Sequence, residues 1–317
     1  CSVVQAPATV DVMKRSKCDY QFCYCEENVY KFLEKFLVAV EVEKRREAVA
    51  CHVTPSEGVS ACLDSLPAPV TVPVDPRACD MGAACIFSTY SEDPRREKKN
   101  VWNSSFLIMV EDVFGLVPSS QSDGATTPTP KVTSESYSTW DYHVVALIRI
   151  RQTKVWYVVD FDSKICAAPL PVASSDHALE AIRADVYMNI AFKSQHKLLS
   201  IAPQLSRQLK PLLHRGVDLH LRIVEAVDYL TWLRTDRTHM LHGGVHHQPV
   251  PSWDAIQSPS PILSMLSQSL QCSQFVPRSV GPLREWEQQN NLASFINMRN
   301  TVTVPGVVVH RDAFHPW

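Results

Sequence analysis

The sequence has no apolar run that approaches the roughly 20 residues of a membrane-spanning helix. Its first 20 residues contain no apolar signal core, because charged side chains interrupt them. It also lacks a basic excess, since 31 Lys and Arg stand against 33 Asp and Glu, a formal net charge of -2. Without such an excess, little attraction to a phosphate backbone is expected. We therefore expect a soluble intracellular protein, cytoplasmic with the nucleus as a second location, that binds neither nucleic acid nor membrane.

The ten cysteines lack the dense spacing of a disulfide-rich secreted domain, and a chain of 317 residues can bury a core without crosslinks. Cys18, Cys23 and Cys25 crowd together, but they do not form the paired Cys-x2-Cys units of a zinc site. A second set of potential ligands lies in a Gly- and Pro-containing loop, namely His242, His246 and His247. Neither spacing favours a metal site, and we expect no bound metal.

The segment Cys23-Tyr24-Cys25 directly precedes a long amphipathic stretch. Its apolar residues recur at helical spacing, at Val29, Phe32, Leu33, Phe36, Leu37 and Val40. This pattern predicts a helix over 25–48 with Cys25 at its N-terminus. The unpaired N–H groups and the macrodipole there can lower a cysteine pKa from about 8.5 to roughly 3.5–7.5. Cys25 is therefore a candidate nucleophile, and the alternative interpretation is a buried, inert thiol.

The remaining chain alternates strand-like and helix-like segments with stretches rich in Pro, Ser and Thr. Strands are predicted at 83–90, 106–110 and 306–309, two or three helices within 177–234, and helical segments at 262–270 and 292–296. We interpret residues 1–317 as a single catalytic domain with a flexible leader at 1–17. Within it we predict loop insertions at 52–82 and 117–138 and a helical insertion at 198–220.

Two β-rich runs between residues 140 and 162 flank a short polar turn and predict a hairpin buried on both faces. If residues 152 and 153 form the turn, position 145 faces 160 and position 143 faces 162. His143, Asp160 and Asp162 then lie on one face of the hairpin, because side chains alternate with period two. Ideal register places Asp162 opposite His143 and Asp160 diagonal to it.

A helix-terminal Cys, a His at a strand start and an Asp on the next strand supply the parts of a thiol acyl-transfer site. The base must reach the thiol, and a third group must orient the imidazole. The candidates are Cys25, His143, and either Asp160 or Asp162, in an order similar to that of papain and the transglutaminases. A general cysteine protease or acyltransferase could use the same three groups. A non-enzymatic interaction protein is the other alternative, for which a missing triad member would be expected.

Five segments, in the same order, resemble the successive motifs of the protein N-terminal glutamine amidohydrolases. They are Cys23-Tyr24-Cys25-Glu26-Glu27-Asn28-Val29-Tyr30, Trp140-Asp141-Tyr142-His143-Val144-Val145, Asp160-Phe161-Asp162, Asp236-Arg237-Thr238-His239-Met240 and Asn291-Leu292-Ala293-Ser294-Phe295-Ile296-Asn297-Met298. The resemblance covers about half of the chain. A further family segment resembles both 182–187 and 222–230, and the second of these keeps the motif order better.

The resemblance implies an α/β (α+β) protein of the papain/transglutaminase-like cysteine hydrolase fold, with helices packed around an antiparallel sheet. It implies a thiol amidohydrolase that converts an N-terminal glutamine to glutamate and releases ammonia, upstream of an arginylation-dependent N-degron pathway. In that family's pattern Cys25 is the nucleophile, His143 the acid and base, and Asp160 the orienting carboxylate. No cofactor is implied, and a monomer acting on proteins or peptides with N-terminal Gln is expected.

Selectivity for a chain terminus requires an anion that binds the substrate's α-ammonium group. The acidic residues closest in sequence to the three catalytic candidates are Glu26, Glu27, Asp141 and Asp162. For each of the first three taken alone, helix capping or exposure to solvent is the simpler interpretation.

Overall fold

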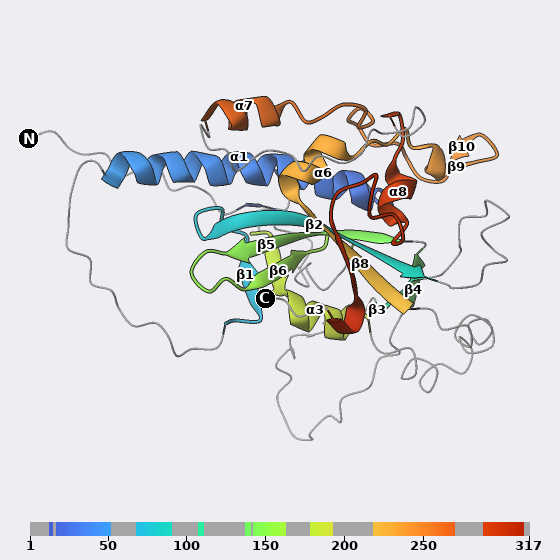
Figure 1. Ribbon diagram of the computed structural model, residues 1–317, viewed down its shortest axis with the longest axis horizontal. Coiled ribbons are helices and arrows are strands. Elements are labelled where there is room, and N and C mark those ends of the chain that lie inside the picture. The colour runs from blue at the N-terminus through green and yellow to red at the C-terminus, as the bar shows by residue number, and fades with distance from the viewer. Residues whose placement is uncertain are drawn as a thin grey trace, which may run out of the picture.

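A seven-stranded antiparallel sheet forms the middle layer of the computed structural model (Figure 1). The structure describes residues 13–14, 17–51, 68–90, 107–110, 137–140, 142–162, 178–192, 218–269 and 288–313. The strand order is β1-β7-β6-β5-β2-β8-β11. In chain order these strands are β1 (Thr71–Pro73), β2 (Cys79–Tyr90), β5 (His143–Ile150), β6 (Trp156–Val159), β7 (Glu180–Arg183), β8 (Asp218–Glu225) and β11 (Val307–His310).

Helices cover both faces of this sheet. On one face lie α1 (Cys25–Cys51), α6 (Ala226–Trp232) and α7 (Ile262–Ser269), with α1 against β5 and β2, whereas α3 (Ala184–Ala191) lies on the other face (Figure 1). Side chains of β5 alternate between the two cores: Val144 and Ala146 join the one that contains α1, and Val145 and Leu147 join the one that contains α3. The prediction of a hairpin buried on both faces is thus confirmed.

The long helix α1 begins at Cys25, as the apolar spacing predicts, and ends at Cys51 rather than near Ala48. Its apolar stripe is buried, with Phe32, Leu33 and Phe36 inaccessible to solvent. Each such side chain contributes roughly 1.5–3 kcal/mol by leaving water. This burial fixes α1, and with it Cys25, against the sheet.

The β5–β6 hairpin has the predicted register, since Ala146 pairs with Val159 and Ile148 with Tyr157. Two backbone hydrogen bonds close the turn: the N–H of Ile150 donates to the carbonyl of Val155, and the N–H of Lys154 donates to the carbonyl of Ile150. The ladder ends at Ala146 and Val159, so the segment that contains Asp160 and Asp162 continues beyond the end of β6.

The prediction that 177–234 is helical is wrong in part. Residues 180–183 form β7, and β8 (Asp218–Glu225) pairs with β2 and β11 inside the sheet. The spacing of Leu219, Ile223, Val227 and Leu230 fits a helix only because strand β8 runs directly into α6. Within β8, Leu219, Leu221 and Ile223 alternate with period two, which is typical of a strand.

Smaller elements complete the described structure. The predicted strand near 106–110 is β3 (Leu107–Val110), which pairs with β4 (Tyr137–Trp140). The predicted helical segments at 262–270 and 292–296 are α7 and α8 (Leu292–Ile296), and the final strand is β11. The other short elements are η2 (Thr238–Met240), β9 (Leu241–His242), β10 (Val245–His246) and η4 (Arg311–Ala313).

Several predicted segment boundaries need correction. Strand β1 and the start of β2 lie inside the predicted loop 52–82, β4 begins inside 117–138, and β8 begins inside the predicted helical insertion 198–220. In the predicted leader, the N–H of Met13 donates to the carbonyl of Val74, and the carbonyl of Met13 accepts from the N–H of Leu179. The C-terminal end of the leader is therefore attached beside the sheet. Residues 14, 17, 68–70 and 74–78 of these four segments are also described. The rest of the four segments lies outside the described residues.

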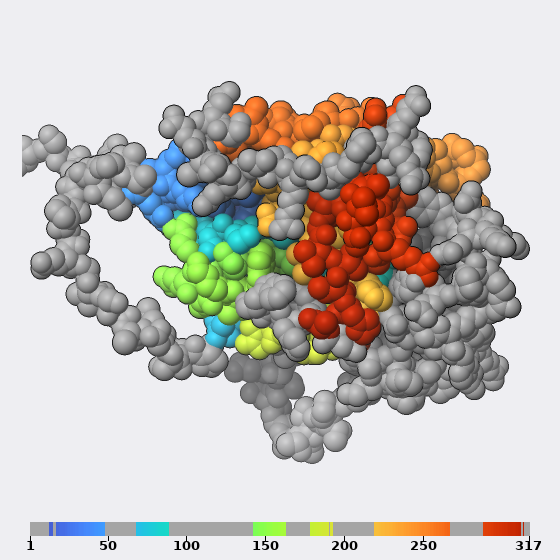
Figure 2. All heavy atoms as spheres, viewed as in Figure 1, coloured from blue at the N-terminus to red at the C-terminus, as the bar shows by residue number. Residues whose placement is uncertain are grey.

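A buried guanidinium helps to hold the C-terminal segment 288–313, in addition to the pairing of β11 with β8. Figure 2 shows much of this segment as a red patch on the molecular surface. From β8, Arg222 donates to the carbonyl oxygens of Phe295 and Asn297 at 2.9 Å, and burial lowers its pKa to about 10. Gly306, at φ 109°, passes so close to β8 that a Cβ atom would lie 2.7 Å from the carbonyl oxygen of Ile223.

The fold is therefore mixed α/β with a large antiparallel sheet, as predicted, while its papain/transglutaminase-like character stays a prediction. Among the helices of the described residues, none has the length and apolarity to cross a membrane.

Candidate active site

Cys25 is the first residue of α1 and is almost completely buried, with 4% of its surface exposed. The preceding loop is closed by Asn28, whose side-chain amide exchanges two 2.8 Å hydrogen bonds with the backbone of Gln21. Cys23 takes a left-handed conformation, φ 67°, and Tyr24 accepts the first helical hydrogen bond from Asn28. These contacts fix the position from which the Cys25 side chain leaves the helix.

His143, the first residue of β5, meets Asp160 just beyond the end of β6. The imidazole Nε2 lies 3.1 Å from Oδ1 of Asp160, and both side chains are inaccessible to solvent. Asp160 also accepts hydrogen bonds from the hydroxyl of Tyr187, at 2.7 Å, and from the backbone N–H of Asp162, at 3.0 Å. The imidazole is thus held by a carboxylate that is itself held by two further donors.

The thiol of Cys25 lies beside the same imidazole. The Sγ of Cys25, a ring nitrogen of His143 and a carboxylate oxygen of Asp162 lie within 4.8 Å of one another. Asp162 also accepts a 2.8 Å hydrogen bond from the hydroxyl of Tyr20. The structure therefore brings Cys25 and His143 together with both candidate aspartates. Asp160 is bonded to the imidazole, and Asp162 lies close to the thiol.

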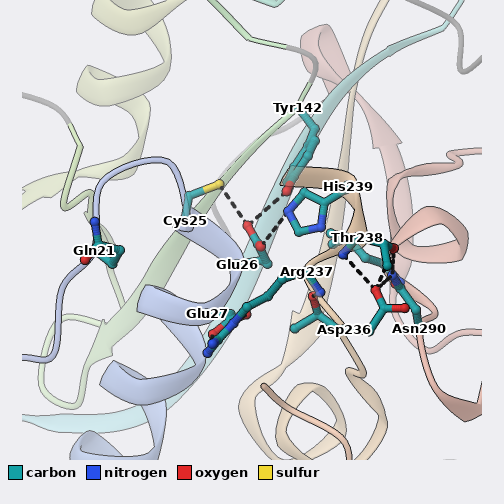
Figure 3. Close-up of polar contacts among 12 residues, drawn as sticks. Gln21, Cys25, Glu26, Glu27, Tyr142, Asp236, Arg237, Thr238, His239 and Asn290 are labelled. Carbon is teal, nitrogen blue, oxygen red and sulfur yellow. Dashed lines mark hydrogen bonds and ion pairs between the residues drawn. The ribbon is translucent and has the colours of Figure 1, made fainter. Parts of the chain in front are cut away.

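Glu26 is a buried acid that faces the thiol. Figure 3 shows Cys25, Tyr142 and His239 converging on its carboxylate. The thiol donates to Oε2 at 3.6 Å, the hydroxyl of Tyr142 donates to the same oxygen at 2.9 Å, and Nε2 of His239 lies 3.1 Å from Oε1. Because Glu26 has no exposed surface, its charge acts on these neighbouring groups with little screening by solvent.

Glu27 points away from the thiol and forms a separate ion pair (Figure 3). Its two oxygens accept from Arg237 at 2.8 and 2.7 Å, and Oε2 also accepts from the indole of Trp253 at 2.7 Å. The structure thus does not bring Glu27 into the site, since these partners already occupy its carboxylate. Asp141, the other predicted ammonium ligand next to the triad, lies outside the described residues.

One loop supplies both Arg237 and His239. Arg237 adopts the left-handed conformation, φ 63°, and Thr238 donates from its hydroxyl to Asp236 at 2.7 Å. Asn290, from the C-terminal segment, also donates to Asp236. Two residues of this loop, Arg237 and His239, thus reach Glu27 and Glu26, two adjacent acids of α1.

The predicted lowering of the Cys25 pKa is wrong. Burial raises the pKa of this thiol well above its ordinary value, and the charges of Glu26 and Asp162 raise it further. A backbone hydrogen bond from Val144 acts in the opposite direction but is outweighed. The helix terminus does not lower the pKa because burial, and then the surrounding carboxylates, disfavour a negative charge on the thiol.

The pKa values of the other titratable groups depend on whether their partners outweigh the effect of burial. Burial alone would lower the pKa of His143, but the Asp160 charge and hydrogen bond raise it above 6.5. Burial alone would raise the pKa of Asp160, yet His143 and Tyr187 lower it below 3.8. For Asp162, burial is the largest effect and Asp160 adds to it, so its pKa rises to about 6.

Two tyrosines brace the site from opposite faces of the sheet, and each is the fourth residue of a helix that directly follows a strand. Tyr187 of α3 bonds Asp160, and Tyr229 of α6 donates to the backbone carbonyl of Glu26 at 3.1 Å. The segments 182–187 and 222–230, which both resemble one family motif, thus share the same strand-to-helix geometry.

Several residues that contact the candidate site are absent from the sequence-based candidates, and four of these lie in segments already quoted for the family resemblance. Tyr142 and His239 lie within motifs already quoted for the family resemblance, and Tyr187 ends one of the two competing segments. Arg237 precedes His239 in the same motif, but the sequence does not reveal that its partner is Glu27.

A family-level sequence match over residues 126–316 assigns the chain to the hydrolases that act on amide bonds. A sequence model of the N-terminal glutamine amidase family matches residues 126–316, and the chain belongs to this family. His143, Asp160 and Asp162 lie within the matched residues, whereas Cys25 and Glu26 precede them. No curated protein matches the chain.

Proposed function

We propose that this protein deamidates the side chain of an N-terminal glutamine by a thiol mechanism, with Cys25 as nucleophile, His143 as general acid and base, and Asp160 as the orienting group. The observation that carries this proposal is the convergence of the Cys25 thiol and the Asp160-bound imidazole of His143 at one buried point. Family membership supplies the substrate class.

The hydrogen bond to Asp160 engages Nε2 of His143, so Nδ1 is the ring nitrogen that takes the thiol proton. The sulfur then attacks the carboxamide carbon of the glutamine side chain. The imidazolium returns its proton to the departing ammonia, and a thioester remains on Cys25. The neutral imidazole next activates water, which hydrolyses the thioester and leaves glutamate.

The first backbone N–H groups of α1 can stabilise the oxyanion that forms in each step. N–H groups in the first turn of a helix have no intrahelical acceptor. Those of Cys25 and Glu26 lie in this turn, next to the thiol. Donors of this type, when they point to the developing charge, lower the barrier by about 2.7–4 kcal/mol each.

Selectivity for a chain terminus follows from the acids around the thiol. Glu26 and Asp162 both oppose ionisation of Cys25. A substrate's α-ammonium group bound beside them offsets their charge and thereby favours the thiolate. A glutamine within a chain, or one with an acetylated amine, brings no such charge and leaves the thiol protonated.

The test compares peptides that differ only in the position or acetylation of glutamine, with ammonia release as the measurement. A Gln-initiated peptide is expected to release ammonia, while the N-acetylated and internal-Gln peptides release little. Glu26→Gln should raise KM for the Gln-initiated peptide. It should also reduce the difference in the rate of ammonia release between this peptide and the acetylated one. Equal turnover of all three peptides would contradict the proposed selectivity and favour a transglutaminase-like activity.

The product carries an N-terminal glutamate. We propose that it enters an arginylation-dependent N-degron pathway, which uses acidic N-termini as acceptors for arginine. Incubation of the deamidated peptide with an arginyltransferase and labelled arginyl-tRNA tests this step, because the untreated Gln peptide should take up no label.

A further inference from the structure

Cys25, His143 and Asp162 present three different ligand atoms to one point. They offer a sulfur, an imidazole nitrogen and a carboxylate oxygen, all within 4.8 Å of one another. The three residues come from separate parts of the fold, namely the start of α1, the start of β5 and the segment after β6. Packing of α1 against the sheet thus assembles a mixed ligand set that the chain does not contain in any single segment.

The imidazole in this set is oriented by an outer carboxylate. His143 is bonded through Nε2 to Asp160, which Tyr187 holds in turn at 2.7 Å. Metal-binding histidines almost always use their second nitrogen in this way, and the outer partner fixes the tautomer and makes the ligand more basic. An arrangement that prepares His143 as a general base therefore also prepares it as a metal ligand.

The charge around these atoms is predominantly negative. The carboxylates of Glu26, Asp160 and Asp162 surround the thiol, and the basic groups that face them are the imidazoles of His143 and His239. The nearby guanidinium of Arg237 is directed to Glu27 instead. A divalent cation would relieve this excess and allow the thiol to ionise, because a coordinating thiol loses its proton to the metal.

We propose that Cys25, His143 and Asp162 form an inhibitory binding site for a thiophilic divalent cation, for which Zn²⁺ is the best match. Zinc accepts sulfur, nitrogen and oxygen ligands at about 2.0–2.3 Å and tolerates three protein ligands with a fourth position open. Magnesium and calcium prefer oxygen ligands alone. This site shares only Cys25 with the set of Cys18, Cys23 and Cys25, and it shares no residue with the histidine loop.

Binding replaces the S–H bond of Cys25 with an S–Zn bond and releases the proton to solvent, without any change in oxidation state. The sulfur lone pair that attacks a carboxamide is then engaged by the metal, so catalysis stops while the ion is bound. Removal of the ion by a chelator restores the thiol. The binding step involves no substrate, so it can be tested independently of the proposed deamidation.

The test uses the full chain after chelator treatment and measures metal binding directly. Titration with Cd²⁺, which reports thiolate coordination by a charge-transfer absorption band, should give one ion per chain, and Zn²⁺ should displace it. Proton release during the Zn²⁺ titration should reach at least one proton per bound ion, because the Cys25 thiol and any protonated fraction of the other two ligands lose their protons on binding. Ammonia release from a Gln-initiated peptide should fall with Zn²⁺ and recover on addition of EDTA.

Matched variants assign the ligands. Cys25→Ser should abolish the absorption band, whereas Cys23→Ser, two residues away, should keep it. Asp162→Asn should weaken binding at least as much as the roughly 10- to 100-fold that loss of an outer partner costs, and Asp185→Asn, in a surface pair with Arg183, should not. Circular dichroism of each variant checks its fold.

A band of undiminished intensity in folded Cys25→Ser, or unchanged affinity in Asp162→Asn, would overturn the site. If Cys25→Ser does not fold, the wild-type measurement still decides, because stoichiometric binding without proton release excludes a newly formed thiolate. Absence of any tight metal-dependent band in the wild-type protein would overturn the proposal outright.

Discussion

His143 and Asp160 lie in direct contact, with Nε2 3.1 Å from Oδ1, at a point that solvent does not reach. Their strands end in a ladder whose ideal continuation would pair position 143 with 162 instead. The chain leaves that ladder after Val159, and Asp160 is then held by Tyr187 on the α3 side of the sheet. Local hydrogen bonds beyond the strand, rather than strand register, thus select the partner of the imidazole.

We expect Asp160→Asn to lower turnover by about 10⁴, the loss that follows removal of the orienting carboxylate in a comparable triad. Asp162→Asn should cost much less, because Asp162 does not hold the imidazole. Steady-state measurement of ammonia release on both variants, with the fold checked by circular dichroism, decides between them. A greater loss in folded Asp162→Asn would reverse the assignment of the two aspartates.

Cys25→Ala should abolish ammonia release, while Cys23→Ala should leave a substantial fraction of it. Cys23 lies outside α1 and has a left-handed backbone conformation. Alanine and cysteine both carry a Cβ atom, so the substitution at position 23 adds little backbone strain. The measurement is turnover of a Gln-initiated peptide by each folded variant. Equal loss in both would remove Cys25 as the sole nucleophile.

The pH dependence should reflect His143, which must be neutral to accept the thiol proton. Because Asp160 raises the pKa of His143 above 6.5, activity is expected to increase with pH through a value above 6.5. Asp160→Asn removes that charge, so the pKa of His143 should move lower. NMR titration of the imidazole resonance in the wild type and in the variant measures both values, and an unmoved titration would contradict the coupling.

Asp162→Asn should stabilise the fold at neutral pH. The pKa of Asp162 is about 6 in the folded protein and 3.8 as a model group, so the fold prefers the protonated acid. This contribution is complete below pH 3.8 and is lost as pH rises through about 6, so ionised Asp162 destabilises the protein above that pH. The substitution by asparagine should therefore raise the free energy of unfolding at neutral pH by an amount on the order of 1–3 kcal/mol.

Urea unfolding at about pH 7.5 and about pH 5 tests this, because the gain should be larger at the higher pH. Asp185→Asn, whose carboxylate pairs with Arg183 at the surface, is the control and should show no such pH-dependent gain. A destabilised Asp162→Asn at the higher pH would mean that the Tyr20 hydrogen bond outweighs the charge effect.

Glu27→Gln should destabilise the fold rather than alter substrate binding. Breaking a buried pair leaves the charge of Arg237 uncompensated, at a cost of about 3–5 kcal/mol. Glu47→Gln, in an exposed pair with Arg151, provides the control and should cost about 0–1 kcal/mol. Urea unfolding gives the free energies, and KM measured on folded Glu27→Gln should be near that of the wild type.

The sequence predicts the parts of this molecule whose signal is local. The start of α1 at Cys25 follows from a helical apolar stripe, and the register of β5 and β6 follows from one short turn. The choice of Asp160 rested on family resemblance, and the contact with His143 now supports it. Strand β8 is not predicted from the sequence, because its alternating pattern merges with the helical spacing of α6.

The electrostatics of the site could not be predicted, because they depend on burial between elements distant in sequence. Glu26 and Glu27 are neighbours with the same chemistry, and only the docked loop around Arg237 separates their roles. The pKa of Cys25 was predicted from its helix terminus alone. The carboxylate of Asp162, from a strand end more than a hundred positions away, adds to the burial that reverses it.

The helix α1 carries the reactive thiol at one end and fills the core beneath the sheet with its length. Any local opening that lifts this helix therefore separates sulfur from imidazole before the sheet itself is lost. Ammonia release is thus a sensitive reporter of helix docking, because it requires α1 and the sheet to be in place together. The cooperative unit that contains α1 therefore sets the denaturant concentration at which catalytic competence is lost.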